Sequence, residues 1–466
     1  AATWCVEDDP DAQRQDLAAL SLPDLPLTAV CGSVGAGRTT TALTMALAAV
    51  AAAPDTHLYV LADHTGALAA LSQLPQTGAV LDRTDPATIG FLVDRLSAEV
   101  RHRQQSGWQQ PGPRRPATDP EDVCAAYLFV VIDGWDVVSE ACDELDHGAV
   151  TDRLLAVLRE GFAVGVRAVV TGDRSVLTGR LSRTFPNRLL LRPADDTDVL
   201  LCGLNRRDLP SHWPPGRLVG TDGIQRQVVQ RTVADIPVPG PERPPWRVVT
   251  LPARIPLTDV GPAGPGSFPI ALTAGGEAAA CGGNGRRRIL VLGSNGSGRT
   301  TALATIAEQA YQAGRPVCAV TDPTGDMHDL TAGTAEQVGW SDTERLIELR
   351  RAHPDLVVVA DDIGRHLDSP IVSVLEQIAD LVERDGGLIA VAGESAGIGL
   401  RTRGVGPAVA RGRTAIVLGR ASTVDGDLVG ARLPRTRDAV PGRGWLIADR
   451  QVTPVQLAMT GVMSRS

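Results

Sequence analysis

The feature that most constrains the fold of this 466-residue chain is a glycine pattern that occurs twice. Residues 32–40 read Gly-x4-Gly-Arg-Thr-Thr, and residues 293–301 repeat the same spacing 261 positions later. Each copy follows an apolar run and precedes an alanine-rich stretch, so each predicts a strand, a tight turn and a helix. A spacing of 261 residues leaves room for a complete α/β domain, and the sequence therefore predicts two domains of one kind.

Three further patterns recur downstream of each glycine turn in the same order. They are Asp-x-x-Leu-x-Gly at 198–203 and 425–430, Pro-Gly-Arg at 215–217 and 441–443, and a glutamine-bearing segment near 226 and near 450. One chance match would carry little weight, whereas four matches in one order indicate a duplicated domain.

Two segments are too rich in proline and polar residues for regular structure. Residues 236–246, IPVPGPERPPW, disfavour a helix or central strand because proline fixes φ and lacks an N–H donor. We therefore predict a first domain over 1–235, a linker over 236–246 and a second domain over 247–466. Residues 103–122, inside the first copy, are interpreted as a solvated loop.

Apolar runs alternate with helical patterns in both copies, which is typical of a parallel sheet covered on both faces. The expected strands lie at 28–32, 56–62, 126–133 and 167–172, and at 288–293, 316–320, 356–362 and 388–393. The expected helix boundaries include a start at Asp85-Pro86, an end at Gly161, and starts at Ser341-x-x-Glu344 and Ser369-Pro370. The predicted fold class is α/β, with a mostly parallel, helix-covered sheet in each domain.

Glycine turns of this spacing bind phosphate, because their curled backbone points several amide N–H groups at one anion. The positive end of the following helix adds to this field, and the hydroxyl after the basic residue ligates Mg²⁺. A plain structural turn is the alternative for either copy alone, but the setting and the repetition favour nucleotide binding. The predicted binding residues are Gly32, Ser33, Val34, Gly35, Ala36, Gly37, Arg38, Thr39 and Thr40, and Gly293, Ser294, Asn295, Gly296, Ser297, Gly298, Arg299, Thr300 and Thr301, with Thr39 and Thr300 as magnesium ligands.

Arginine stands at positions 38 and 299, where such loops usually carry lysine. A guanidinium makes charge-assisted bonds to phosphate oxygens, but it is wide and planar and places a γ-phosphate less well than a compact ammonium group. All 45 basic side chains are arginine, so the substitution also follows the composition of the whole chain. The arginines alone do not decide between nucleotide binding and nucleotide turnover.

Acidic residues end one apolar strand in each copy. Asp133 and Asp361 fit the role of the carboxylate that orders Mg²⁺, partly through its waters. The next residue positions the attacking water in a hydrolase, and it is Gly134 in the first copy and Asp362 in the second. Asp136, two residues beyond Gly134, could take this role only if the chain bends. We therefore predict that Asp361 and Asp362 form the better catalytic pair, and that Asp362→Asn abolishes hydrolysis and spares binding. The candidate γ-phosphate sensors on neighbouring strands, with plain strand-end capping as the alternative, are Thr171 and Ser395.

The composition restricts the class of protein. No apolar stretch reaches the roughly 18 residues that span a bilayer, and a net charge of −9 disfavours a basic surface for nucleic acid. Seven scattered cysteines without a CxxC pattern predict buried thiols in a reducing compartment. The chain begins with alanine rather than methionine, and we expect it to be part of a longer protein.

The motifs resemble those of FtsK/SpoIIIE-type translocases, and among these the EccC/EssC motor ATPases of type VII secretion. The resemblance covers nearly the whole chain and is closest to the second and third ATPase modules of those proteins. The segments that carry it are VEDDPDAQRQDLAALSL, VVIDGWD, GVRAVVTGDR, NRLLLRPADDTD, PPGR and PGRGWLIADRQVTPVQLA.

The resemblance implies two tandem RecA-like domains, with ATP and Mg²⁺ as cofactors. It also implies a homo-oligomeric ring or hexamer, joined through an upstream membrane-anchored ATPase module to a secretion channel at the cytoplasmic face of the membrane. The later modules of such proteins are often degenerate, which agrees with Arg38, Arg299 and Gly134 here. The last module can hold the C-terminal signal of a small helical secreted protein.

Two other functions remain open at this stage. A double-stranded DNA translocase of the same superfamily would need a basic channel and usually a small DNA-reading domain, so the acidic chain favours it less. A non-hydrolysing regulatory scaffold, in which nucleotide only holds domains together, is favoured by Arg38, Arg299 and Gly134, for the first copy at least. Salt-dependent DNA binding would indicate the former, and nucleotide-dependent melting without phosphate release would indicate the latter.

Overall fold

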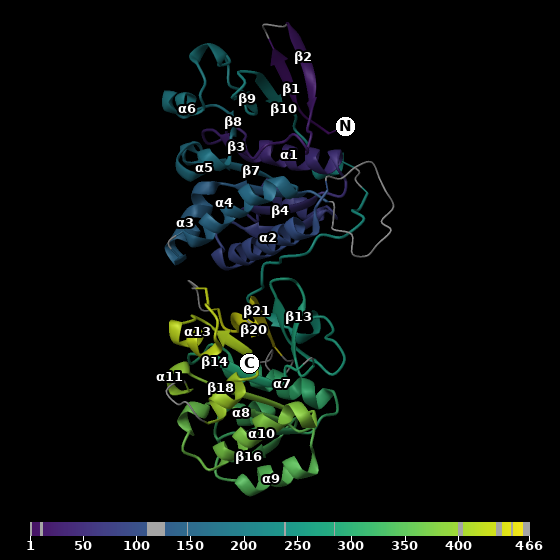
Figure 1. The fold of residues 1–466 in the computed structure, drawn as a ribbon, viewed down its shortest axis with the longest axis vertical. Helices are drawn as coiled ribbons and strands as arrows, with labels where there is room; N and C mark the ends of the chain where they lie inside the picture. The colour runs from purple at the N-terminus through teal and green to yellow at the C-terminus, as the bar shows by residue number, and fades with distance from the viewer. Residues whose placement is uncertain are drawn as a thin grey trace. The chain divides into compact units, whose positions relative to one another are not determined.

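The computed structural model describes residues 2–9, 13–109, 126–146, 148–236, 239–283, 285–398, 404–434, 440–448 and 451–459. The chain forms two compact units, Ala1–Thr250 and Leu251–Ser466, which we call the first and the second module. Each module is built around one β-sheet with helices packed on it (Figure 1). Within the described ranges, no helix is long and apolar enough to cross a membrane.

The described part of the first sheet has ten strands in the order β2-β1-β10-β9-β8-β3-β7-β6-β4-β5. Figure 1 shows the hairpin of β1 and β2 at the end of this sheet that is remote from β4. The strands from β8 to β5 are parallel, whereas β9, β10, β1 and β2 continue the sheet in antiparallel pairs. The strands are β1 (Thr3–Asp9), β2 (Arg14–Ala19), β3 (Thr28–Cys31), β4 (His57–Ala62), β5 (Thr77–Asp82), β6 (Leu128–Asp133), β7 (Val166–Gly172), β8 (Asn187–Leu190), β9 (Arg217–Gly220) and β10 (Gln225–Val228).

Helices cover both faces of the parallel strands, which explains why these strands are apolar throughout. Helix α1 packs on one face with η1, and α2, α3 and α4 pack on the other. Helix α2 begins as predicted, since the Asp85 carboxylate accepts from two backbone N–H groups and Pro86 occupies the first position. The helices are α1 (Arg38–Ala52), η1 (Ala67–Gln73), α2 (Pro86–Ser106), α3 (Trp135–Asp146), α4 (Ala149–Gly161), η2 (Phe162–Val164), η3 (Arg174–Leu177), α5 (Gly179–Thr184), α6 (Asp196–Leu201), η4 (Arg206–Asp208) and η5 (Val233–Asp235).

One prediction for the first module is wrong. Residues 103–106 form the last turn of α2 instead of a solvated loop, and Arg103 is fully buried. Its guanidinium donates to Glu99 and to two backbone carbonyl oxygens from distant parts of the chain, which is how the fold accommodates the charge. Residues 110–122 of the predicted loop lie outside the described residues. The helix end predicted at Gly161 is confirmed, because α4 ends there, and a separate helix, α3, lies between β6 and α4.

The second sheet repeats the first strand by strand, in the order β13-β12-β21-β20-β19-β14-β18-β17-β15-β16, with β11 paired to β21. The predicted fold, two tandem modules with mostly parallel, helix-covered sheets, is therefore confirmed. The strands are β11 (Ile255–Pro256), β12 (Phe268–Thr273), β13 (Ala278–Cys281), β14 (Arg288–Gly293), β15 (Val317–Val320), β16 (Glu336–Val338), β17 (Val357–Ala360), β18 (Leu388–Gly393), β19 (Thr414–Leu418), β20 (Arg443–Ala448) and β21 (Gln451–Met459).

The helices of the second module begin close to their predicted starts, with one correction. The N-cap of α9 is Asp342, whose side chain accepts from the N–H of Arg345, and not Ser341. Helix α10 follows Ser369 and Pro370 as predicted. The helices are η6 (Leu257–Asp259), α7 (Arg299–Gln312), α8 (Asp326–Thr331), α9 (Thr343–Ala352), η7 (Ile363–Arg365), α10 (Ile371–Asp385), α11 (Ser395–Ile398), α12 (Val405–Ala410) and α13 (Thr423–Val429).

Residues 239–248, which overlap the predicted linker, lie against β4 and β5 of the first module; we call them the edge segment. Trp246 stacks on Tyr59 with ring centroids 4.0 Å apart. The N–H of Val248 donates to the carbonyl oxygen of Gly78 at 3.1 Å, and Nε2 of His57 lies 2.9 Å from a carbonyl oxygen of the segment. The chain itself therefore covers this end of the first sheet.

Candidate functional site

Both glycine loops connect a central strand to a helix, β3 to α1 in the first module and β14 to α7 in the second. Gly35 and Gly37 have φ values of +74° and +105°, and Gly296 and Gly298 have values of +76° and +106°. Side chains disfavour this left-handed backbone, which turns successive amide groups toward the inside of the loop. The strand–turn–helix setting expected of a phosphate loop is present in both modules.

The repeated Pro-Gly-Arg turns lie directly against the loops. The N–H of Gly216 donates to the carbonyl oxygen of Ala36 at 2.9 Å, and the N–H of Gly442 donates to that of Ser297 at 2.8 Å. A Cβ at Gly37 would lie 2.9 Å from the backbone nitrogen of Gly216, so this contact requires glycine. The pattern recurs in the sequence because it supports each loop from outside.

In the first module, the hydroxyl and carboxylate predicted to bind magnesium are neighbours. Oγ1 of Thr39 lies 3.2 and 3.1 Å from the two carboxylate oxygens of Asp133 and donates to them. Asp133 is buried at the end of β6, where the Thr171 hydroxyl also donates to it, at 2.7 Å. The predicted sensor Thr171 therefore contacts the predicted magnesium carboxylate.

The second module repeats this pair. Oγ1 of Thr300 donates to Asp361 at 2.6 Å. Burial raises the pKa of the Asp361 carboxyl group, and the hydrogen bonds from Thr300 and from the N–H of Asp362 lower it only in part. A buried carboxylate of this kind gains from a nearby cation.

The donor set suits Mg²⁺ better than a tightly caged metal. Hydroxyl and carboxylate oxygens are the ligands that Mg²⁺ prefers, and this ion usually keeps several waters and binds substrate phosphates. Among the described residues, no group of three or more His, Cys, Asp or Glu side chains could hold a metal alone. Each Thr–Asp pair therefore fits a magnesium ion that is bound together with nucleotide.

The two loop arginines differ in their contacts. Arg299 is only 7% exposed, and it donates to the carbonyl oxygen of Gly293 at 2.9 Å and to Oδ1 of Asn295 at 3.0 Å. It also donates to Oδ1 of Asp362 at 3.0 Å. Arg38 forms no hydrogen bond or ion pair with any residue in the described ranges. Arg38 is thus available to an anion, whereas Arg299 already has a carboxylate partner.

An arginine fills the space beside Gly134, at the position of the water-positioning residue in a hydrolase. Gly134 has a φ of +81°, and a Cβ there would lie 2.5 Å from Nη1 of Arg83. This nitrogen donates to the carbonyl oxygen of Asp133 at 2.9 Å and lies 3.7 Å from its carboxylate. Sequence reasoning missed Arg83 because it lies 50 residues upstream of Asp133, with no motif around it.

Asp362, the predicted catalytic base, is engaged by arginines. Its carboxylate contacts Arg299 and lies 3.6 Å from Nη1 of Arg365. Its backbone φ of +48° is in the left-handed region, which aspartate tolerates better than most residues. Asp361 and Asp362 are thus adjacent as predicted, but their side chains contact different parts of the loop.

The predicted sensor Ser395 has a different partner from Thr171. Its hydroxyl donates to Asp425 in the capping box of α13. In the first module, Arg174 donates at 2.8 Å to Asp198, which belongs to the matching capping box of α6. Ser395 is therefore the counterpart of Arg174 and not of Thr171. Its contact with a helix capping box is closer to a structural capping role than to the predicted role of a γ-phosphate sensor.

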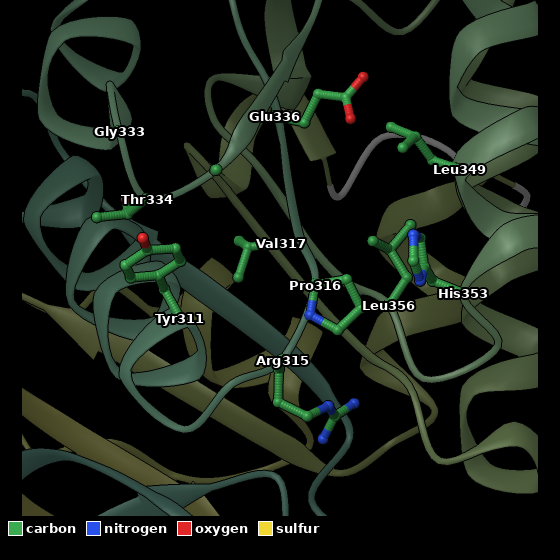
Figure 2. A pocket seen from close by; sticks show the side chains of 11 residues that line it. Tyr311, Arg315, Pro316, Val317, Gly333, Thr334, Glu336, Leu349, His353 and Leu356 are labelled. Carbon is green, nitrogen blue, oxygen red and sulfur yellow. The ribbon is translucent and has the colours of Figure 1, made fainter.

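A separate pocket of about 360 Å³ lies at the β15–β16 edge of the second sheet. Figure 2 shows Tyr311 and Thr334 on one side of it, His353 and Leu356 on the other, and Val317 at the start of β15 between them. The glycine loop follows the end of β14, a strand with the same direction as β15. The pocket and the loop therefore lie at opposite ends of the parallel strands.

The pocket corresponds to the place that the edge segment covers in the first module. Strands β4 and β15 occupy the same position in the two sheets. Strand β4 pairs with β6 and β15 pairs with β17, and superposing these two pairs places Leu61 at the position of Val320. The same pairing aligns His57 with Pro316, and pairing with β5 and β16 aligns Gly78 with Ala335. Pro316 and Ala335 line the pocket, whereas His57 and Gly78 contact the edge segment.

In each module, a glycine loop precedes a helix, and an acidic residue ends the second strand away from the loop strand. This arrangement defines the chain as a tandem P-loop protein with two modules of one fold. Residues 11–113 match the FtsK/SpoIIIE family, and the family resemblance that the motifs predict is confirmed.

The chain is similar to proteins of type VII secretion. It is 26% identical over 303 residues to the ESX-4 secretion system protein EccC4 of Mycobacterium tuberculosis (strain ATCC 25618 / H37Rv), a match that covers 60% of this chain and 24% of that protein. The chain thus spans about a quarter of the length of this relative.

Two solved structures share the fold of both modules. EssC (ATPases 2 and 3) from Geobacillus thermodenitrificans matches with a TM-score of 0.61 and 18% identity, covering 98% of this chain and 96% of that one. Thermomonospora curvata EccC (ATPases 2 and 3), in complex with a signal sequence peptide, matches with a TM-score of 0.57 and 18% identity, covering 98% and 92%. The predicted correspondence to the second and third ATPase modules is confirmed for the fold.

Proposed function

We propose that the chain forms two nucleotide-binding modules of a type VII secretion ATPase, which couple ATP binding and weak hydrolysis to the recognition and export of protein substrates. The observation that carries this proposal is the hydroxyl–carboxylate pair behind each glycine loop, Thr39 with Asp133 and Thr300 with Asp361. The same pair occurs in both modules, and in each the threonine lies in the first turn of the helix that follows the glycine loop. This repetition favours nucleotide binding over two purely structural turns.

Different residues of each site would bind different parts of the nucleotide and its magnesium ion. The amides of residues 32–37 and 293–298, with the helix ends behind them, bind the anionic phosphates. The hydroxyl groups of Thr39 and Thr300 would ligate Mg²⁺, and the carboxylates of Asp133 and Asp361 would hold it through its waters. When bound, Mg²⁺ neutralises charge on the β- and γ-phosphates.

The two modules are proposed to differ in turnover. In the first, Gly134 has no side chain to accept a proton from an attacking water, and Arg83 lies between its position and Asp133, so this module retains nucleotide without hydrolysis. Oδ1 of Asp136 lies 3.7 Å from the Cβ position of Gly134, and Asp136→Asn should therefore leave phosphate release unchanged. In the second, Asp361 is followed by a carboxylate, and any weak hydrolysis arises there. The first module thus acts as the non-hydrolysing scaffold considered above, within a protein that keeps one weak catalytic site.

Titration of the whole chain with ATP and Mg²⁺ tests the nucleotide sites. We expect the melting temperature to rise by an amount that depends on ATP concentration, because a ligand that binds the folded state stabilises it. Thr39→Val and Thr300→Val should each remove part of the rise, and phosphate release should be lost only with Thr300→Val. A melting temperature that ATP leaves unchanged would contradict nucleotide binding at both loops.

We also propose that the pocket at the β15–β16 edge binds a peptide segment of a secreted substrate. The support is internal, since the equivalent surface of the first module holds an extended segment of the chain itself through backbone hydrogen bonds and an aromatic contact. A related structure with the same fold is in complex with a signal sequence peptide. A C-terminal signal of a small helical secreted protein is the proposed occupant.

A fluorescent peptide that carries such a signal tests the pocket. Ala335→Trp should fill the pocket and weaken peptide binding at least about tenfold, while nucleotide binding stays as in the parent chain. Tyr311→Ala removes an exposed ring at the pocket wall and should weaken binding less. The peptide-binding proposal fails if the peptide binds the Ala335→Trp chain as tightly as the parent.

We finally propose that the chain works beside an upstream, membrane-anchored ATPase module and a secretion channel, in a homo-oligomeric ring at the cytoplasmic face of the membrane. The support is the greater length of the secretion relatives, of which this chain matches a part. In-cell cross-linking from engineered cysteines on α3 would test it. Cross-links to membrane-embedded secretion components are expected, and their absence from several positions would contradict this location.

A further inference from the structure

At the second glycine loop, a carboxylate of the chain itself occupies the arginine that a nucleotide phosphate would bind. The guanidinium of Arg299 is buried within the loop, where Asp362 accepts a hydrogen bond from Nη2 at 3.0 Å. Glu394 lies further away, 4.0 Å from Nη1, on a more exposed side chain. Arginine binds carboxylate and phosphate with the same planar set of donors, so Asp362 uses bonding capacity that a nucleotide phosphate would need.

The first loop lacks this competitor. Gly134 stands at the position of Asp362, and among the described residues Arg38 forms no hydrogen bond to a carboxylate, interacting with Asp173 only through its charge. The two loops otherwise share their glycine conformations and their Thr–Asp pairs. The loop arginine therefore has a hydrogen-bonded carboxylate partner, Asp362, in the second module only.

We propose that Asp362 is an affinity-determining residue, a counter-ion that competes with nucleotide phosphate for Arg299 and makes the second loop bind nucleotide more weakly than the first. This inference rests on the proposed nucleotide binding and deepens it. Release of Arg299 to phosphate separates it from Asp362, which retains Arg365 as a partner 3.6 Å away. The role assigned to Asp362 here differs from that of a general base.

Asparagine is the matched substitution at this position. Asp362→Asn removes the charge but keeps the size, and asparagine tolerates the backbone φ of +48° as aspartate does. Asp329→Asn is the control, because it makes the same change in net charge at an exposed side chain on α8 that pairs with no described residue.

The measurement is calorimetric titration of the whole chain with AMP-PNP and Mg²⁺, in an Arg38→Ala background that weakens the first loop. A Thr39→Val background repeats the test independently. We expect Asp362→Asn to tighten binding at the second loop at least about fivefold, since a carboxylate no longer has to be displaced from a buried arginine. Asp329→Asn should leave the affinity within about twofold of the background chain.

The outcomes separate this inference from the proposed function. Affinity that is unchanged or weaker in Asp362→Asn overturns the inference while nucleotide binding stands. If AMP-PNP binds the second loop neither in the background chain nor in Asp362→Asn, the proposed nucleotide binding at this loop is wrong, and the inference is wrong with it. Binding that is measurable only with Asp362→Asn supports both.

Discussion

Partial burial makes the ionised carboxylate of Asp361 unfavourable in free energy, and a nearby cation would reduce this cost. Because burial raises the pKa of this carboxyl group, its ionised form is disfavoured in the folded protein. We predict that Asp361→Asn raises the melting temperature of the second module at pH 7 by about 2 °C or more, without nucleotide. Differential scanning calorimetry of the whole chain measures this change.

The same residue gives a pH dependence with a defined sign. A carboxyl group whose folded pKa is raised binds more protons when folded, so its contribution to stability is present at low pH and is lost as pH rises through that pKa. The advantage of Asp361→Asn over the parent chain should therefore be small near pH 4 and grow toward pH 7. A difference that does not change with pH would contradict the burial explanation.

Gly134 is required for both its conformation and its small size. Gly134→Ala places a side chain at a φ of +81° and 2.5 Å from Arg83, and we predict a loss of about 2–3 kcal/mol in the stability of the first module. Gly35→Ala is the control, because Gly35 has a φ of +74° but nothing within 4 Å of its Cβ position. It should lose only the conformational part, about 1 kcal/mol.

A double-mutant cycle separates the two causes. In an Arg83→Ala background, Gly134→Ala should cost about 1 kcal/mol less than in the parent chain, because the clash is gone and the backbone strain remains. Urea unfolding of the whole chain, followed by signals of the first module, measures the cycle. Costs that simply add would mean that Arg83 does not occupy the space beside Gly134.

At the scale of elements, the sequence predicts the central strands well and the sheet ends poorly. Strands such as β4 and β6 are buried on both faces, so each is a continuous apolar run that can be read directly. The hairpin of β1 and β2 is different, because β2 is mostly exposed and β1 pairs with β10, with Cys5 opposite Val228. No local pattern reports a pairing across more than two hundred residues.

The candidate site also contains contacts that the sequence predicts and contacts that it does not. The Thr39–Asp133 pair is predictable because a phosphate loop and an acidic strand end are both local patterns, and parallel strands bring their carboxyl ends together. Arg83 and the Arg299–Asp362 pair are not predictable, since each depends on where one long side chain turns. The sequence therefore predicts the position of each candidate nucleotide site better than the side-chain contacts that distinguish the two sites.

The edge segment is the element whose contribution is easiest to isolate. Trp246 is half-buried against Tyr59, and Trp246→Ala removes the stacked ring pair. We predict a loss of about 2 kcal/mol in the first module and faster amide hydrogen exchange in β4 and β5. Trp213→Phe, at another partly buried tryptophan of the same module, is the control. Unchanged exchange in β5 would show that the segment does not protect the edge.

At the scale of the whole molecule, one fold carries two loops with different electrostatics. The first has two guanidinium groups at its glycine loop, Arg38, which interacts with Asp173 only through its charge, and Arg83, which lies beside Asp133. The second has Arg299 paired with Asp362 and a partly buried Asp361 whose pKa is raised by desolvation. Duplication preserved the sheet order and the loops, while single side chains changed the charge around them.

This difference predicts unequal dependence on magnesium. With ATP and excess EDTA, the first module should keep much of its ATP-induced rise in melting temperature, because its arginines supply positive charge that Mg²⁺ otherwise provides. The second module should lose most of its rise, because its loop arginine is occupied and its carboxylate repels the phosphates. Thr39→Val and Thr300→Val assign the two calorimetric transitions. Equal losses in both modules would mean that Arg38 and Arg83 do not replace the cation, and that the charge difference between the loops has no effect on nucleotide binding.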